Sequence, residues 1–144
     1  MKSVAQLLKG KGNLVHSISP AAPVMECLKL FADKGIGAAL VMEGEKMVGI
    51  FIERDYARKV ALYDKSSKDL KVQEVMDAEV LWVSPESTNE ECMALMTEKR
   101  IRHLPVMKTG KVIGIISIGD LVKDIIAEQG FVIEHLERYI RGDH

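Results

Sequence analysis

The sequence predicts a mixed α/β fold of the α+β type, in which two copies of a strand–helix–strand–strand–helix unit pack sheet to sheet about a pseudo-two-fold axis. The first observation behind this prediction is an internal repeat at a fixed offset, which pairs Cys27 with Cys92. The second is the alternation, within each copy, of short apolar runs with amphipathic stretches. The third is the length of 144 residues, which is close to one domain, so each copy is too small to bury both faces of its own sheet.

The repeat aligns residues 19–59 with residues 84–124 without a gap, and 13 of these 41 pairs are identical. Unrelated segments of ordinary composition would share about two or three identities. A further match lies just upstream, at a slightly larger offset, and pairs Val4, Leu7 and Leu8 with Val72, Val75 and Met76. The chain is therefore a duplicated unit of about 60 residues, in which each copy has a helical leader.

Each unit is expected to begin with a short strand, at residues 14–18 and 80–83, which ends at a Ser-Pro pair. A helix follows, because apolar residues recur at helical spacing. These residues are Val24, Cys27, Leu28 and Phe31 in the first copy, and Cys92, Met93, Leu95 and Met96 in the second. Thr88 is the expected N-cap of the second of these helices, with Glu91 in the capping-box position.

Two apolar runs around a Gly-containing turn then predict a β-hairpin in each unit. The expected strands are residues 38–42 with 47–52, and residues 103–107 with 112–116. A second helix should start at the aspartate of each copy and cover residues 55–63 and 120–128. A separate amphipathic helix over residues 131–141 either joins a dimer interface or covers the end of the sheet.

These elements divide the chain into five segments. They are a helical leader (1–13), the first unit (14–65), a linker with a second helical leader (66–79), the second unit (80–128) and the C-terminal helix (129–144).

Composition excludes several classes of function. The net charge of −1 and the aromatic content of 5% argue against a nucleic-acid or anionic-membrane binder. The apolar runs are too short to span a bilayer, and residues 1–11 lack the apolar core of a signal peptide, so the expected compartment is the cytoplasm. The two cysteines are far apart in sequence, without a Cys-x-x-Cys or Cys/His cluster, so no metal site is expected.

The most informative polar pair is Ser117 and Asp120, which stand where the last strand runs into a helix. Backbone N–H groups at a helix N-terminus favour anions, and a carboxylate can accept both hydrogen bonds of a ribose diol. The alternative interpretation is structural: Asp120 caps the helix and Ser117 supports the turn. In the first copy, Asp55 occupies the same register.

The Gly-x-x-Ser-x-x-Asp stretch of residues 114–120 follows the strand Arg102-His103-Leu104-Pro105-Val106. With the opening Ser-Pro pairs and the tandem arrangement, these residues resemble a pair of CBS domains, also called a Bateman module, of the stand-alone bacterial signal-transduction type. The resemblance spans about Val4 to Glu128. It implies a module without catalysis that binds AMP, ADP, ATP or NAD in clefts between the units and senses energy or metabolite state. It also implies a homodimer that acts on an unidentified regulated protein.

Carried over by position, the resemblance implies that Asp120 holds the ribose hydroxyls and that Ser117 contacts ribose or phosphate. The other positions that it assigns to the nucleotide are Gly119, Arg102, His103, Ser19, Gly37 and Ala38. Gly37 and Ala38 are small enough for a ligand to approach the backbone closely. Arg102 and His103 would face phosphates; otherwise Arg102 is a solvated surface charge and His103 a histidine at the interface between the units.

The first unit departs from this pattern, because Ile52 stands where the second unit has Ser117. The Asp55 site therefore lacks the hydroxyl, although Arg54 could offer a guanidinium fork to phosphate, and Ser84 is the counterpart of Ser19. Two outcomes are open: an asymmetric second nucleotide site, or a vestigial cleft in which Asp55 only caps its helix. Asp120 is the favoured site. The alternative function is a protein-interaction and dimerisation scaffold that binds no ligand.

Overall fold

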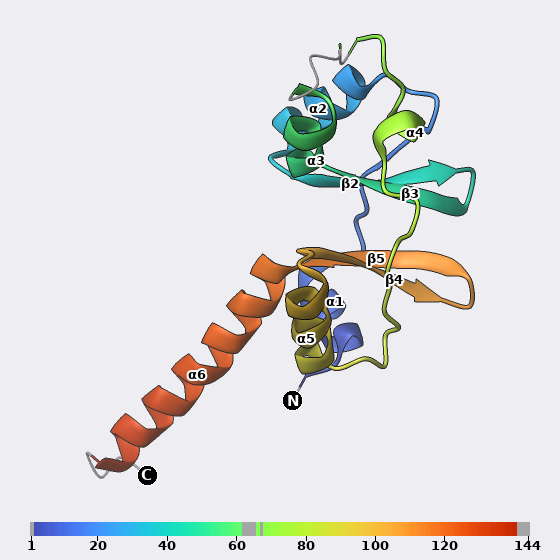
Figure 1. Ribbon diagram of the computed structural model, residues 1–144. Coiled ribbons are helices and arrows are strands. Elements are labelled where there is room, and N and C mark those ends of the chain that lie inside the picture. The colour runs from blue at the N-terminus through green and yellow to red at the C-terminus, as the bar shows by residue number, and fades with distance from the viewer. Residues whose placement is uncertain (1, 62–65, 67, 141–144) are drawn as a thin grey trace.

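The structure of the protein is a computed structural model that describes residues 2–61, 66 and 68–140. Two small sheets face each other, and helices cover the outer face of each (Figure 1). This arrangement confirms the predicted α+β class and the duplicated organisation.

The first unit contains β1 (Ser17–Ile18), α2 (Val24–Lys34), β2 (Ala38–Glu43), β3 (Lys46–Ile52) and α3 (Glu53–Lys59). The strand β1 pairs in parallel with β2, which pairs antiparallel with β3. The second unit contains α5 (Asn89–Lys99), β4 (His103–Lys108), β5 (Lys111–Ser117) and α6 (Ile118–Ile140). Thr88 caps α5, as predicted, by accepting the N–H of Glu91 at 3.1 Å.

The first strand of each unit is much shorter than predicted. Only Ser17 and Ile18 of residues 14–18 form a strand, and of residues 80–83 only Val83 pairs, through a single parallel bridge to Val106. The physical reason is that both segments carry the chain from one unit to the other, so only their last residues reach a neighbouring strand (Figure 1).

The helical predictions need two corrections. Residues 120–128 and 131–140 belong to one continuous helix, α6, rather than to two, because Gly130 stays helical and nothing ends the helix there. A glycine inside a helix costs only about 1 kcal/mol, which is too little to break it. The helix predicted over residues 55–63 begins earlier, at Glu53, and ends at Lys59; its residues 62 and 63, like Arg141, lie outside the described residues.

The two leader helices, α1 (Val4–Lys11) and α4 (Val72–Val75), are exchanged between the units. The apolar residues of α1 complete the core of the second unit, around Cys92, Leu104 and Ile116. Those of α4 complete the core of the first unit, around Cys27 and Phe51. Each unit therefore completes its core with a leader helix from outside its own repeat (Figure 1).

Equivalent backbone contacts fasten both leaders. Ser3 forms an antiparallel bridge with Thr88, and Lys71 forms the corresponding bridge with Pro23. Each leader also packs on a strand glycine: a Cβ on Gly114 would lie 2.8 Å from Leu8, and one on Gly49 would lie 2.5 Å from Met76. This close approach explains why both copies carry glycine at that strand position.

We predict that the two cores respond separately to leader substitutions. Leu8→Ala should cost about 2–5 kcal/mol of unfolding free energy and should speed alkylation of Cys92 more than of Cys27. Val75→Ala should also destabilise the protein, but it should speed alkylation of Cys27 more than of Cys92. Burial is the main cause that raises the pKa of Cys27 to about 12 and of Cys92 to about 11, so both thiols should be inert in the native protein.

The measurement is the alkylation rate of each cysteine, followed by peptide mass spectrometry, with the exposed Lys9→Ala as control. If Leu8→Ala speeds the alkylation of Cys27 more than that of Cys92, the exchange of the leaders is contradicted.

Candidate functional site

The cleft between the units contains a pocket of about 420 Å³ beside the start of α6. Small-molecule sites usually measure roughly 300–1,000 Å³. Residues from both units and from the segment after α1 line this pocket, which we call the Asp120 cleft. Its lining includes Lys11, Gly37, Ala38, His103, Ser117 and Asp120.

Ser117 and Asp120 form a reciprocal pair at the N-terminus of α6. The N–H of Ser117 donates to Asp120 Oδ2 at 2.8 Å, and the N–H of Asp120 donates to Ser117 Oγ at 3.2 Å. This geometry is that of a capping box. Because both side chains also line the cleft, the structural and the functional interpretations of the pair are compatible.

Lys11 bonds to the same carboxylate from the end of α1. Its Nζ lies 2.6 Å from Asp120 Oδ2 and 2.6 Å from the carbonyl oxygen of Ile115. Burial alone would raise the pKa of Asp120, but the hydrogen bonds from Lys11 and Ser117 outweigh it and hold the pKa below its ordinary value. Asp120 is therefore an ionised acceptor at neutral pH.

Part of the wall contributed by the first unit carries little side-chain bulk, although Ile36 also lines the pocket. Gly37 and Ala38 stand where α2 leads into β2, and the carbonyl of Gly37 accepts the N–H of Glu53 at 2.8 Å. Small residues at these positions allow the backbone to approach a planar ligand closely. Gly37 and Ala38 thus lie on one side of the cleft, and Ser117 and Asp120 lie on the other.

His103 stands opposite Ser117 in the antiparallel pairing of β4 with β5. Its Nδ1 is buried and has no hydrogen-bond partner among the described residues. Burial is the main cause that lowers the pKa of His103, and the positive charges of Lys11, Arg102 and Arg54 lower it further, against the opposing effect of Asp120. His103 is therefore a neutral imidazole with one ring nitrogen unpaired.

The pseudo-symmetric mate of this cleft is divided into smaller pockets. One of about 130 Å³ is lined by Ile52, Arg54, Arg102 and His103, and one of about 270 Å³ shares Arg54 and Arg102 with it. In the alignment of the two copies, Arg102 and His103 replace Gly37 and Ala38, and Ile52 replaces Ser117. Larger side chains therefore narrow the mate cleft, and the helix that follows Ile52 has no side-chain cap.

The sequence profile of the CBS domain matches residues 14–62 and 72–127, which cover the first unit and the second unit together with the leader α4. The chain belongs to the CBS-domain family. CBS domain-containing protein CBSX3, mitochondrial, of Arabidopsis thaliana is 37% identical over 99% of this chain and 73% of its own length. The solved structure of a putative signal-transduction protein with CBS domains from Burkholderia ambifaria MC40-6 is 52% identical. It has a TM-score of 0.86 and covers 89% of this chain and 96% of its own.

The CBS pair of protein MJ0100, solved in complex with 5′-methylthioadenosine and S-adenosyl-L-methionine, shares the fold. Its TM-score is 0.78 over 89% of this chain and 98% of its own, at 19% identity.

The structure of this CBS pair does not bring every residue that the sequence predicts to the Asp120 cleft. Ser19 accepts the N–H of Ala21 at 3.3 Å, and Ser84 Oγ lies 3.4 Å from Ser87 Oγ, so both hydroxyls serve their own turns. Arg102 and Arg54 lie at the mate cleft, where Arg54 donates to the carbonyl of Arg100 at 3.4 Å. Gly119 and Asp55 are not among the residues that line either pocket.

Sequence reasoning missed the contribution of the segment around α1. Lys11, Gly12, Leu14 and His16 all line the Asp120 cleft, although they precede or open the first CBS unit. The only sequence signal was the match of Val4, Leu7 and Leu8 to the second leader, which indicates a packed helix. It does not show that this helix packs on the opposite unit.

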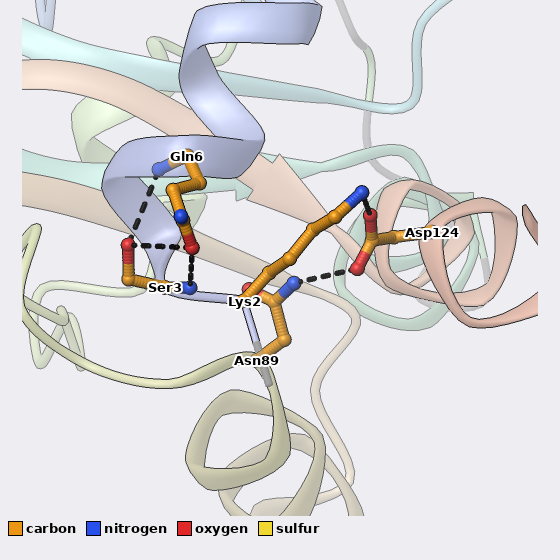
Figure 2. Close-up of polar contacts among 5 residues, drawn as sticks. All are labelled: Lys2, Ser3, Gln6, Asn89 and Asp124. Carbon is orange, nitrogen blue, oxygen red and sulfur yellow. Dashed lines mark hydrogen bonds and ion pairs between the residues drawn. The ribbon is translucent and has the colours of Figure 1, made fainter. Parts of the chain in front are cut away.

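A second contact joins the N-terminal segment to α6 one turn beyond Asp120. Lys2 Nζ and Asn89 Nδ2 each lie 2.9 Å from a different oxygen of Asp124 (Figure 2). Asp120 and Asp124 are one helical turn apart and so share a face of the helix. Lysines at the two ends of the leader therefore bond to successive turns of α6.

Within the described residues, no helix is long and apolar enough to cross a membrane. The same part of the chain contains no group of three or more His, Cys, Asp or Glu side chains that could hold a metal ion.

We predict that His103 makes stability depend on pH. Its folded pKa lies below the unfolded value near 6.5, so the unfolded chain binds more protons as pH falls through this range. The unfolding free energy should therefore decline from pH 7 toward pH 5.5, and this decline should be shallower in His103→Gln. Denaturant titrations at pH 7.5, 6.5 and 5.5 measure both slopes; parallel slopes would contradict the prediction.

Proposed function

We propose that this CBS pair is a regulatory module that binds an adenine nucleotide in the Asp120 cleft. The observation that carries the proposal is the capping box of Ser117 and Asp120, which presents an ionised carboxylate to a pocket of about 420 Å³. A carboxylate at a helix N-terminus is fixed in place. It therefore loses little conformational entropy when it accepts hydrogen bonds from the two hydroxyls of a ribose.

Other groups in the cleft suit the remaining parts of a nucleotide. Gly37 and Ala38 offer backbone and a small side chain to a base. The unpaired Nδ1 of His103 offers an acceptor to a base or hydroxyl, or a donor to phosphate once the ring is protonated. The adenosine derivatives bound to MJ0100 are that protein's ligands, and they make adenylates the first probes to use here.

Regulation would operate by linkage. A ligand that contacts Gly37 in the first unit and Asp120 in the second stabilises the arrangement in which both are in reach. Its effect on a partner cannot exceed the difference in its affinity for the two arrangements. CBS-domain proteins are generally regulatory and non-catalytic modules, and we propose the same for this chain, with the cytoplasm as its compartment and an unidentified protein as its target.

We predict one nucleotide per chain. AMP, ATP and NAD should be titrated by calorimetry into the wild type, Asp120→Asn and Asp55→Asn, with folding checked by circular dichroism. Asp120→Asn should weaken binding about tenfold or more, because a hydrogen bond to a charged group is worth roughly 1.5–3 kcal/mol. Asp55→Asn should stay near the wild type, because Ile52, Arg102 and His103 narrow the mate cleft and Asp55 does not line it.

Two equal sites would contradict the asymmetry between the clefts. If no adenylate gives saturable binding, the sensor proposal fails and the interaction scaffold remains. Native mass spectrometry of freshly purified protein would show a co-purified ligand and the oligomeric state together.

The proposed assembly is a homodimer formed through the outer helices. A groove of about 950 Å³ lies between α5 and α6 and includes the apolar residues Met93, Ala94 and Ile125. Val122 and Ile126, on the same helix, are exposed, and Ile126 keeps 62% of its surface accessible. Exposed apolar patches of this kind are typical of protein interfaces.

We predict that the chain sediments as a dimer and that Ile126→Glu shifts it to the monomer, because a charge would have to be buried in the interface. The control is Lys123→Glu, an exposed charge change on the same helix. Analytical ultracentrifugation at several concentrations measures the shift, and an unchanged dimer in Ile126→Glu would exclude this interface.

A further inference from the structure

One charged side chain in the Asp120 cleft comes from the leader helix α1, outside both aligned repeats. Lys11 places its ammonium 2.6 Å from Asp120 Oδ2 and 2.6 Å from the carbonyl oxygen of Ile115. The two side chains of this ion pair are only 32% and 20% exposed. Solvent therefore screens the pair much less than it screens an ordinary surface pair.

The backbone that carries Lys11 is held in place. Leu8, one turn earlier, packs against Gly114 so closely that a Cβ there would lie 2.8 Å away. At the other end of the leader, Lys2 bonds to Asp124 (Figure 2). When a ligand group replaces Lys11 as the hydrogen-bond partner of Asp120, the flexible side chain of Lys11 can change rotamer, but its Cα stays beside the cleft.

The charges of the cleft then set the requirement for a ligand. A ribose diol is neutral, so it replaces the hydrogen bonds that Asp120 accepts without replacing the charge that Asp120 provides to Lys11. The lining residues include no other acidic side chain; the remaining titratable ones are His16 and His103. A partly buried ammonium that loses its carboxylate is unfavourable, and an anionic group on the ligand restores a charge-assisted bond.

We propose that Lys11 makes the Asp120 cleft selective for ribonucleotides that carry a phosphate, over uncharged ribonucleosides. This inference rests on the proposed nucleotide binding. An uncharged ligand has to displace the Lys11 ammonium from Asp120 without offering it another anion. A phosphate beside the ribose offers that anion and forms a new ion pair with Lys11. In the alignment that pairs Leu8 with Met76, the counterpart of Lys11 is Glu79, so this selection belongs to one cleft only.

The test compares AMP with adenosine by calorimetry in the wild type, Lys11→Met, Lys11→Arg and Lys9→Met. The wild type should prefer AMP by about tenfold or more, which corresponds to one charge-assisted hydrogen bond. Lys11→Met should lower this preference by about tenfold, with adenosine binding at least as tightly as in the wild type. Lys11→Arg should retain the preference because it keeps the charge.

Lys9→Met is the matched control, because Lys9 lies on the same last turn of α1 and is exposed. It should leave the preference unchanged and so separate the local contact from the loss of one positive charge. If AMP binds and Lys11→Met discriminates as the wild type does, Lys11 is not the selective residue. If neither ligand binds to any of the proteins, the nucleotide proposal fails and this inference fails with it.

Discussion

The exchange of the leader helices is the constraint that organises this structure. Each unit completes its core with the apolar face of a leader helix from outside its own repeat, as Leu8 on Gly114 and Met76 on Gly49 show. The connections that follow the leaders therefore have to cross between the units. These crossings hold the two sheets face to face and bring residues 11–16 to the cleft.

Within this symmetric frame, a few substitutions at equivalent positions make the clefts unequal. Gly37 and Ala38 leave room in one, whereas Arg102 and His103 occupy the corresponding space in the other. Ser117 completes a capping box with Asp120, whereas Ile52 cannot supply a hydroxyl to the helix of Asp55. Side-chain volume and one hydroxyl thus decide which cleft presents a preorganised carboxylate, although the hairpin and its flanking helices recur in both units.

Much of the fold could be predicted because it depends on local periodicity. The hairpins, the helices after each Ser-Pro pair and the Thr88 cap agree with the structure to within a few residues. The first strands were overestimated because strand length depends on where the neighbouring strand lies, as the single bridge of Val83 shows. The division of α6 was wrong because Gly130 lowers helix propensity without preventing the helix.

The duplication, the class of each element and the unequal residues of the two clefts all follow from the chain alone, because identity, periodicity and side-chain size are properties of the sequence. The packing of α1 on the second unit does not follow from it, and neither does the reach of Lys11 to Asp120 across 109 positions. An amphipathic helix requires an apolar partner but does not specify which of two equivalent sheets provides it. Long-range packing decides which sheet α1 contacts, and this packing places the positive charge of Lys11 in the cleft.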